Sequence, residues 1–128
     1  MKVLVVDDED DIRRIARLSL AAVGRMDVVE ASSASEGIRK AREECPDIVL
    51  LDVMMPRVDG VSTFQALRSD PETSDIPIVF LTAGARAGET DRLKALGARG
   101  VLIKPFDPMA LPGLLRALLG AEEDRRGD

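Results

Sequence analysis

Short runs of apolar residues that do not alternate with polar ones constrain the fold of this chain most strongly. Four such runs stand at Val3–Val6, Ile48–Leu51, Ile76–Leu81 and Val101–Ile103. An uninterrupted apolar run of this length is typical of a strand buried on both faces, as in a parallel sheet covered by helices on each side. The less apolar segment Asp27–Glu30 predicts a fifth, weaker strand. The chain is therefore predicted to be an α/β protein.

The segments between these runs have the three-to-four-residue apolar spacing of amphipathic helices. Ser33 and Glu36 have the spacing of a capping box, and the helix that they open must end before Cys45-Pro46, because a residue that precedes proline avoids the helical conformation. Glycine is expected to stop the first helix at position 24 and the fourth at position 97. Helices are predicted over 12–23, from Ser33 to just before Cys45, around 61–67, over 87–96 and over 111–119.

Strands and helices alternate five times with short connections, and right-handed crossovers then produce a doubly wound, five-stranded parallel sheet with helices on both faces. We expect a flavodoxin-like strand order, 2-1-3-4-5. A length of 128 residues suits a single domain. We assign residues 1–120 to that domain and residues 121–128 to a polar C-terminal tail that is expected to fray.

Composition argues against several classes of function. The net charge is −5, with no Trp or Tyr and three Phe, so the chain has neither a basic stripe nor a stacking platform for direct nucleic-acid binding. One cysteine, Cys45, and no histidine exclude zinc-site and Cys/His chemistry. No apolar run is long enough for a membrane span, and Asp7 interrupts the first apolar stretch too early for a signal peptide. These features predict a cytoplasmic protein.

Polar residues follow four of the predicted strands. Asp7 and Asp8 follow the first strand, Asp52 the third, Thr82 the fourth and Lys104 the fifth. Ligands of open α/β sheets bind beyond the carboxyl ends of the strands, where the strand order reverses, so the expected order gathers all five side chains at one edge. Each residue alone has an ordinary explanation, such as helix capping for the acids or a lysine stem lying on the core. Their arrival from separate strand ends favours a shared site.

Three neighbouring carboxylates repel one another unless a cation neutralises them, so the pocket predicts a divalent metal. Oxygen ligands without His or Cys suit Mg²⁺ or Mn²⁺, and Mg²⁺ commonly binds one or two carboxylates together with a phosphate. Asp52 ends the central strand and is the best-placed nucleophile for an aspartyl phosphate. Lys104 and Thr82 are expected to bind the phosphoryl oxygens.

Four segments around the predicted site share a recognisable pattern. They are Val5-Val6-Asp7-Asp8-Glu9, Leu50-Leu51-Asp52-Val53-Met54-Met55-Pro56 with Asp59-Gly60, Leu81-Thr82-Ala83 and Lys104-Pro105-Phe106. With these segments the chain resembles the receiver domain of two-component response regulators, in its single-domain, chemotaxis-regulator-like form. The resemblance implies that Asp52 is the phosphoacceptor and that Asp8, Asp52 and the backbone carbonyl of Met54 hold Mg²⁺, with Asp7 acting through a water.

The same resemblance implies roles for the residues around the phosphoryl group. Thr82 and Lys104 take the switch and phosphate-binding roles, with Ala83 beside Thr82 in the same set. The bond between Lys104 and Pro105 is expected to be cis. Val101 occupies the position where the family carries a switching aromatic residue.

The implied function is a signalling switch of a two-component system and not a turnover enzyme, although slow self-dephosphorylation is expected. A histidine kinase or phosphotransfer protein supplies the phosphoryl group, and phosphorylation changes the surface around the fourth helix, fifth strand and fifth helix for an unidentified downstream protein. We expect a monomer or a weak, phosphorylation-dependent dimer.

Three other functions remain as alternatives to the switch. The main one is a receiver-like interaction module that works without phosphorylation, against which the intact set of site residues argues. A metal-dependent phosphatase would need a general acid where Met54 stands. A flavin-binding protein would need a phosphate-cradling loop in place of the acidic run Asp7–Asp11.

Overall fold

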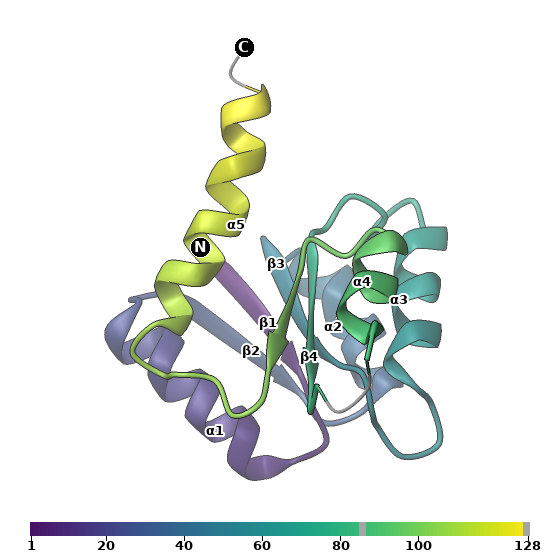
Figure 1. The fold of residues 1–128 in the computed structure, drawn as a ribbon, viewed down its shortest axis with the longest axis horizontal. Coiled ribbons are helices and arrows are strands. Elements are labelled where there is room, and N and C mark those ends of the chain that lie inside the picture. Colours follow the sequence, from purple (N-terminus) through teal and green to yellow (C-terminus); the bar gives the residue numbers. More distant parts are fainter. Residues whose placement is uncertain (85–86, 127–128) are drawn as a thin grey trace.

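The computed structural model describes residues 1–84 and 87–126. Its five strands form one parallel sheet in the order β2-β1-β3-β4-β5, which confirms the predicted topology (Figure 1). The strands are β1 (Lys2–Val6), β2 (Asp27–Ala31), β3 (Ile48–Asp52), β4 (Ile78–Thr82) and β5 (Gly100–Ile103). The helices are α1 (Asp10–Leu18), followed by the π-helical turn η1 (Ser19–Val23), then α2 (Ala34–Glu44), α3 (Gly60–Ser69), α4 (Glu89–Ala95) and α5 (Leu111–Arg126).

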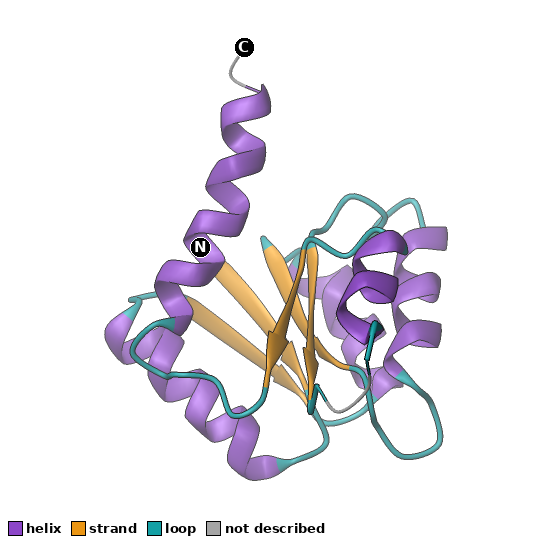
Figure 2. Ribbon diagram, viewed as in Figure 1, coloured by secondary structure: helices purple, strands orange, loops and turns teal. Residues whose placement is uncertain are grey.

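Helices cover both faces of the sheet (Figure 2). Buried residues of α2, α3 and α4 pack in one core cluster, and those of α1, η1 and α5 pack in the other. Successive residues of each strand alternate between the two clusters: Leu4 and Val6 of β1 belong to the first, and Val3 and Val5 to the second. Because both faces are buried, the inner strands are apolar at successive positions up to their carboxyl ends, which explains the uninterrupted runs.

Local sequence signals account for several helix ends. The Ser33 hydroxyl accepts a hydrogen bond from the Glu36 N–H at 3.2 Å, as the capping box predicts, while the Glu36 carboxylate accepts the Ser32 N–H instead of that of Ser33. The helix ends before Cys45-Pro46, as expected. The last turn before Gly24 is π-helical, where the Ser19 hydroxyl donates to the Pro108 carbonyl.

Three predicted boundaries need correction. β4 begins at Ile78 rather than Ile76, and α4 begins at Glu89, after Gly88 at φ +78°. α5 continues through Gly120 to Arg126, so residues 121–126 are helical instead of a frayed tail, and residues 127–128 lie outside the described part. The segment after Gly120 has no proline or further glycine before Arg126 and is rich in helix-forming residues. In Figure 1 this end of α5 extends beyond the sheet.

Within the described residues, no helix is long and apolar enough to cross a membrane.

Candidate functional site

The carboxyl ends of four strands place the predicted site residues at one edge of the sheet. Asp7 directly follows β1, Asp52 ends β3, Thr82 ends β4 and Lys104 directly follows β5. Asp52 is paired in register with Leu81, and Thr82 with Ile103, so the strands end nearly level. The residues therefore lie together because the carboxyl ends of parallel strands share one edge of the sheet, as predicted.

The three aspartates form a compact acidic cluster. Carboxylate oxygens of Asp7, Asp8 and Asp52 all lie within 4.8 Å of one another. Asp7 is fully buried, Asp52 is 3% exposed, and Asp8 is more exposed than either. Oδ1 of Asp52 accepts a hydrogen bond from the Met54 N–H at 3.2 Å, while its Oδ2 is buried without a hydrogen-bond partner among the described residues.

Lys104 is the cation that faces this cluster. Its Nζ lies 2.9 Å from Oδ2 of Asp7, 3.4 Å from Oδ1 of Asp52 and 3.6 Å from Oε1 of Glu9. Its backbone N–H donates to the Thr82 carbonyl at 2.8 Å, which ties the end of β5 to β4. The peptide bond that follows, to Pro105, is cis, as predicted.

One ammonium does not balance the charge of the cluster. The pKa of Asp52 is raised from its ordinary 3.8 to about 6. Burial is the main cause and the charge of Asp7 adds to it, while Lys104 and the Met54 N–H offset part of the rise. Burial alone would lower the pKa of Lys104, but its hydrogen bond and charge interactions with Asp7 and Asp52 outweigh burial and raise it. The raised pKa of Asp52 therefore indicates negative charge that is not fully neutralised.

The donor set fits a hard divalent cation. It offers carboxylate oxygens from three residues, includes an orphaned buried oxygen on Asp52 and contains no nitrogen or sulfur ligand. Such a set suits Mg²⁺ or Mn²⁺ better than zinc or copper. Asp8 and Asp52 are the residues that could hold the ion, and Asp7 belongs to the same cluster. The role of the Met54 backbone carbonyl as a metal ligand remains a prediction.

The Thr82 side chain makes its hydrogen bonds with α4 and the following loop, and none with the acidic cluster among the described residues. Its hydroxyl donates to Oε1 of Glu89 in the first turn of α4, and its oxygen accepts the Gly84 N–H at 3.1 Å. Ala83 is exposed beside it. Glu89 is a residue that the sequence reasoning missed: an acid in the first turn of a helix is common, and only the packed structure shows that it reaches Thr82.

Backbone contacts fix the loop after Asp52. The side chain of Asp59 caps α3 by accepting the Ser62 N–H at 2.7 Å, and the Gly60 N–H donates to the Val53 carbonyl at 2.7 Å. A Cβ atom on Gly60 would lie 2.3 Å from the Asp52 carbonyl oxygen. Glycine is thus required there because the backbone of α3 approaches the end of β3 so closely.

Val101, predicted at the aromatic switch position, lies half-buried on β5 and packs against the core cluster of α2, α3 and α4. It also lines a cavity of about 320 Å³ between α4, β5 and α5. A valine has no ring to exchange between buried and exposed positions.

Comparison with known proteins gives a consistent result. The family model described as response regulator receiver domain matches residues 3–116. A "probable transcriptional regulator ycf27" of Guillardia theta is 42% identical over 92% of this chain and 45% of its own length. The "alkaline phosphatase synthesis transcriptional regulatory protein PhoP" of Bacillus subtilis is 37% identical over 95% of this chain and 50% of its own. The chain thus spans about half the length of these curated relatives.

Solved structures match over nearly their whole length. Chemotaxis protein CheY4 of Vibrio cholerae superposes with a TM-score of 0.83 at 33% identity, covering 91% of this chain and 97% of that chain. A "putative response regulator" of Chloroflexus aurantiacus has a TM-score of 0.84 at 30% identity, covering 93% and 97%.

Proposed function

This chain belongs to the response regulator receiver family, a signalling family, and from that premise we propose that it is a switch operated by Mg²⁺-dependent phosphorylation of Asp52. The observation that supports the proposal best is the cluster of three carboxylates within 4.8 Å, with the Lys104 ammonium 3.4 Å from Asp52. The receiver modifies itself in this reaction and does not turn over an external substrate.

The proposed chemistry is attack by a carboxylate oxygen of Asp52 on the phosphorus of a donor. A new O–P bond forms while the bond from phosphorus to the donor's histidine nitrogen breaks, and the imidazole leaves with that electron pair. Asp8 and Asp52 would hold Mg²⁺, whose positive charge would offset repulsion between the carboxylates and the phosphoryl oxygens. Lys104 is positioned to pair with those oxygens once Asp52 is esterified.

Thr82 must exchange partners to take part. Its hydroxyl now donates to Glu89, and a hydroxyl has one proton to donate. Binding a phosphoryl oxygen therefore releases Glu89 from Thr82 and frees the first turn of α4. This exchange gives the phosphorylated state a different α4 surface, which fits an output through α4, β5 and α5 to a downstream protein.

The donor is expected to be a histidine kinase or phosphotransfer protein. It must reach the edge that carries Asp52, so its docking surface borders that edge. Three exposed apolar side chains lie on α1 and the segment after β5: Ile15 is 40% exposed, Leu18 62% and Met109 71%. The hydrogen bond from Ser19 to Pro108 ties these segments together, and we assign the docking surface to them.

The test is incubation with acetyl phosphate and Mg²⁺, followed by intact mass and backbone amide shifts. Wild type should gain one phosphoryl group only when metal is present, and Asp52→Asn should gain none. Asp75→Asn changes an exposed acid away from the cluster and should react like wild type. A chain that takes up no phosphoryl group and shows no response to Mg²⁺ or beryllium fluoride would instead favour the interaction module that works without phosphorylation.

A further inference from the structure

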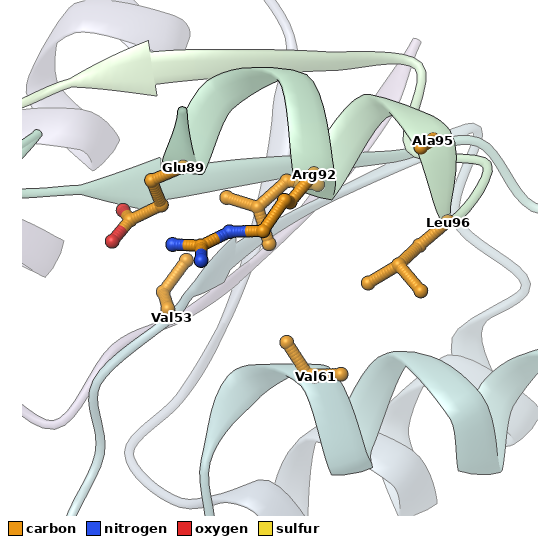
Figure 3. Close-up of a pocket in the computed structure, with 7 residues that line it drawn as sticks. Val53, Val61, Glu89, Arg92, Ala95 and Leu96 are labelled. Atoms are coloured by element: carbon orange, nitrogen blue, oxygen red, sulfur yellow. The ribbon is translucent and has the colours of Figure 1, made fainter. Parts of the chain in front are cut away.

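An apolar cavity lies between α3 and α4, and Val53, the residue after Asp52, forms part of its wall. Its volume is about 480 Å³, within the range of small-molecule sites. None of the three aspartates or Lys104 lines it. Figure 3 shows its walls, which are Val53, Val61, Glu89, Arg92, Leu93, Ala95 and Leu96.

Two charged side chains of α4 border this cavity, and they differ in whether they have a polar partner among the described residues. The Glu89 carboxylate is engaged by the Thr82 hydroxyl. The Arg92 guanidinium points toward Glu89 and over Val53 in Figure 3, yet it has no carboxylate within ion-pair distance in the described part of the chain. An apolar cavity with one unpaired cation at its border matches a ligand that has an apolar body and one anionic group.

We propose that this cavity binds a small apolar anion, such as an aromatic carboxylate or sulfonate, and that it binds this ligand more tightly in the unphosphorylated state. The apolar body lies among Val53, Val61 and Leu93, and the anionic group pairs with Arg92. The Thr82 hydroxyl holds the Glu89 carboxylate, which leaves the Arg92 guanidinium available to the anionic group of the ligand.

The preference of the ligand for the unphosphorylated state follows from the two contacts that Glu89 makes. It forms a wall of the cavity and also holds Thr82, so the cavity described here exists with Thr82 turned toward α4. Drawing Thr82 to a phosphoryl group releases that wall, and by linkage a ligand that needs the wall opposes phosphorylation. The coupling to phosphorylation rests on the proposed function, whereas binding of the ligand to the unmodified chain does not.

The binding test uses a fluorescent pair of probes with related ring systems: anilinonaphthalene sulfonate, which is anionic, and phenylnaphthylamine, which is neutral. Ala95→Phe places a ring in the cavity from an exposed position and should abolish binding of both probes. Arg92→Gln should weaken the anionic probe roughly tenfold and leave the neutral probe unchanged. Ala117→Phe fills the cavity between α4, β5 and α5 and is the matched control, with wild-type affinity expected.

Circular dichroism and amide spectra of each variant establish that the fold is retained. Wild-type binding by folded Ala95→Phe, or equal weakening of both probes in Arg92→Gln, would overturn the site. The coupling is tested by titrating the anionic probe with and without beryllium fluoride and Mg²⁺. A weaker affinity in the fluoride complex supports the coupling, and an unchanged affinity overturns it. Failure of the proposed function would appear separately, as the absence of fluoride-dependent amide shifts around Asp52.

Discussion

At the scale of single residues, the site carries more negative charge than its protein cation neutralises. Asp7 and Asp52 are both buried, and Lys104 is the cation within ion-pair distance of them among the described residues. The raised pKa of Asp52 is the consequence: without metal, its charged form is less stable in the folded chain than in the unfolded one.

Replacing Asp52 by Asn should therefore stabilise the metal-free protein at alkaline pH. The native pKa of about 6 exceeds the ordinary 3.8, so the wild type is penalised above pH 6 and the penalty disappears as the pH falls toward 3.8. Lys104 stays charged throughout, because its pKa is raised. Urea unfolding in EDTA should show Asp52→Asn more stable by about 1–3 kcal/mol at pH 8 and by much less near pH 4.5. An equal gain at both values would contradict this explanation.

Mg²⁺ should stabilise the wild type through Asp8. A ligand that binds only the folded state raises the unfolding temperature as its concentration rises. Asp8→Asn should weaken the apparent Mg²⁺ affinity roughly tenfold or more, measured by thermal unfolding across a Mg²⁺ titration at pH 8. Asp11→Asn, an exposed acid of the same run outside the cluster, serves as control. If both variants lost affinity equally, general charge screening would explain the effect better than a bound ion.

At the scale of elements, the strands are rigid supports and the segments between them carry the adjustable parts. β3 and β4 are buried at every position, whereas α4 has a single buried side chain, Leu93, and no side-chain cap at its N-terminus. The hydrogen bond from Thr82 to Glu89 is thus an important tie between α4 and the site edge. Ala85 and Arg86, between Thr82 and α4, lie outside the described residues.

Gly60 is the glycine at which an added methyl group should be most harmful. An added Cβ would meet the backbone of Asp52 at 2.3 Å and of Val53 at 2.7 Å, and neither can rotate away. Gly60→Ala should lower the free energy of unfolding by at least about 1–3 kcal/mol and also slow phosphorylation, because α3 must shift against the end of β3.

Gly113→Ala is the control, since nothing lies within 4 Å of its added Cβ. It should leave stability unchanged or slightly improved, because alanine favours helix. Urea midpoints of the two variants test the explanation, which would fail if both behaved alike.

At the scale of the whole molecule, one edge of the sheet collects the chemistry and the two helical layers present different surfaces. The exposed apolar side chains on α1 and after β5 belong to the layer of α1 and α5, and the cavity between α3 and α4 lies in the other layer. A protein donor and a small ligand can therefore act on Asp52 from opposite layers.

Leu18→Ser should separate docking from chemistry. Leu18 is 62% exposed, so the change should cost little stability while removing an apolar contact for a donor protein. Phosphotransfer from a phosphohistidine protein should slow roughly tenfold, with the rate from acetyl phosphate unchanged. Leu114→Ser on α5, exposed to 44%, provides the matched control. A slower reaction with acetyl phosphate would show damage to the site instead.

Much of the fold and the site could be predicted because both follow from local pattern and from the geometry of parallel sheets. Continuous apolar runs specify strands buried on two faces, and a polar residue at the end of such a strand must lie at the common carboxyl edge. Asp7, Asp52, Thr82 and Lys104 were placed together on that ground alone. The Ser33 cap was likewise predictable, because it depends on neighbours in sequence.

The tertiary structure decided what depends on side chains meeting across elements. Examples are the hydrogen bond from Thr82 to Glu89, the close approach of Gly60 to β3, and Arg92, which has no ion-pair partner among the described residues. None of these follows from a periodic pattern in the sequence. The polar composition of 121–126 predicts a tail, but the segment continues α5, and composition does not distinguish a polar tail from an exposed helical turn. The sheet, its strand order and the residues at its edge follow from the sequence, since backbone pairing and burial impose them. The partner of each of those side chains depends on tertiary packing, because rotamers and helix positions are fixed only when the helices pack against the sheet.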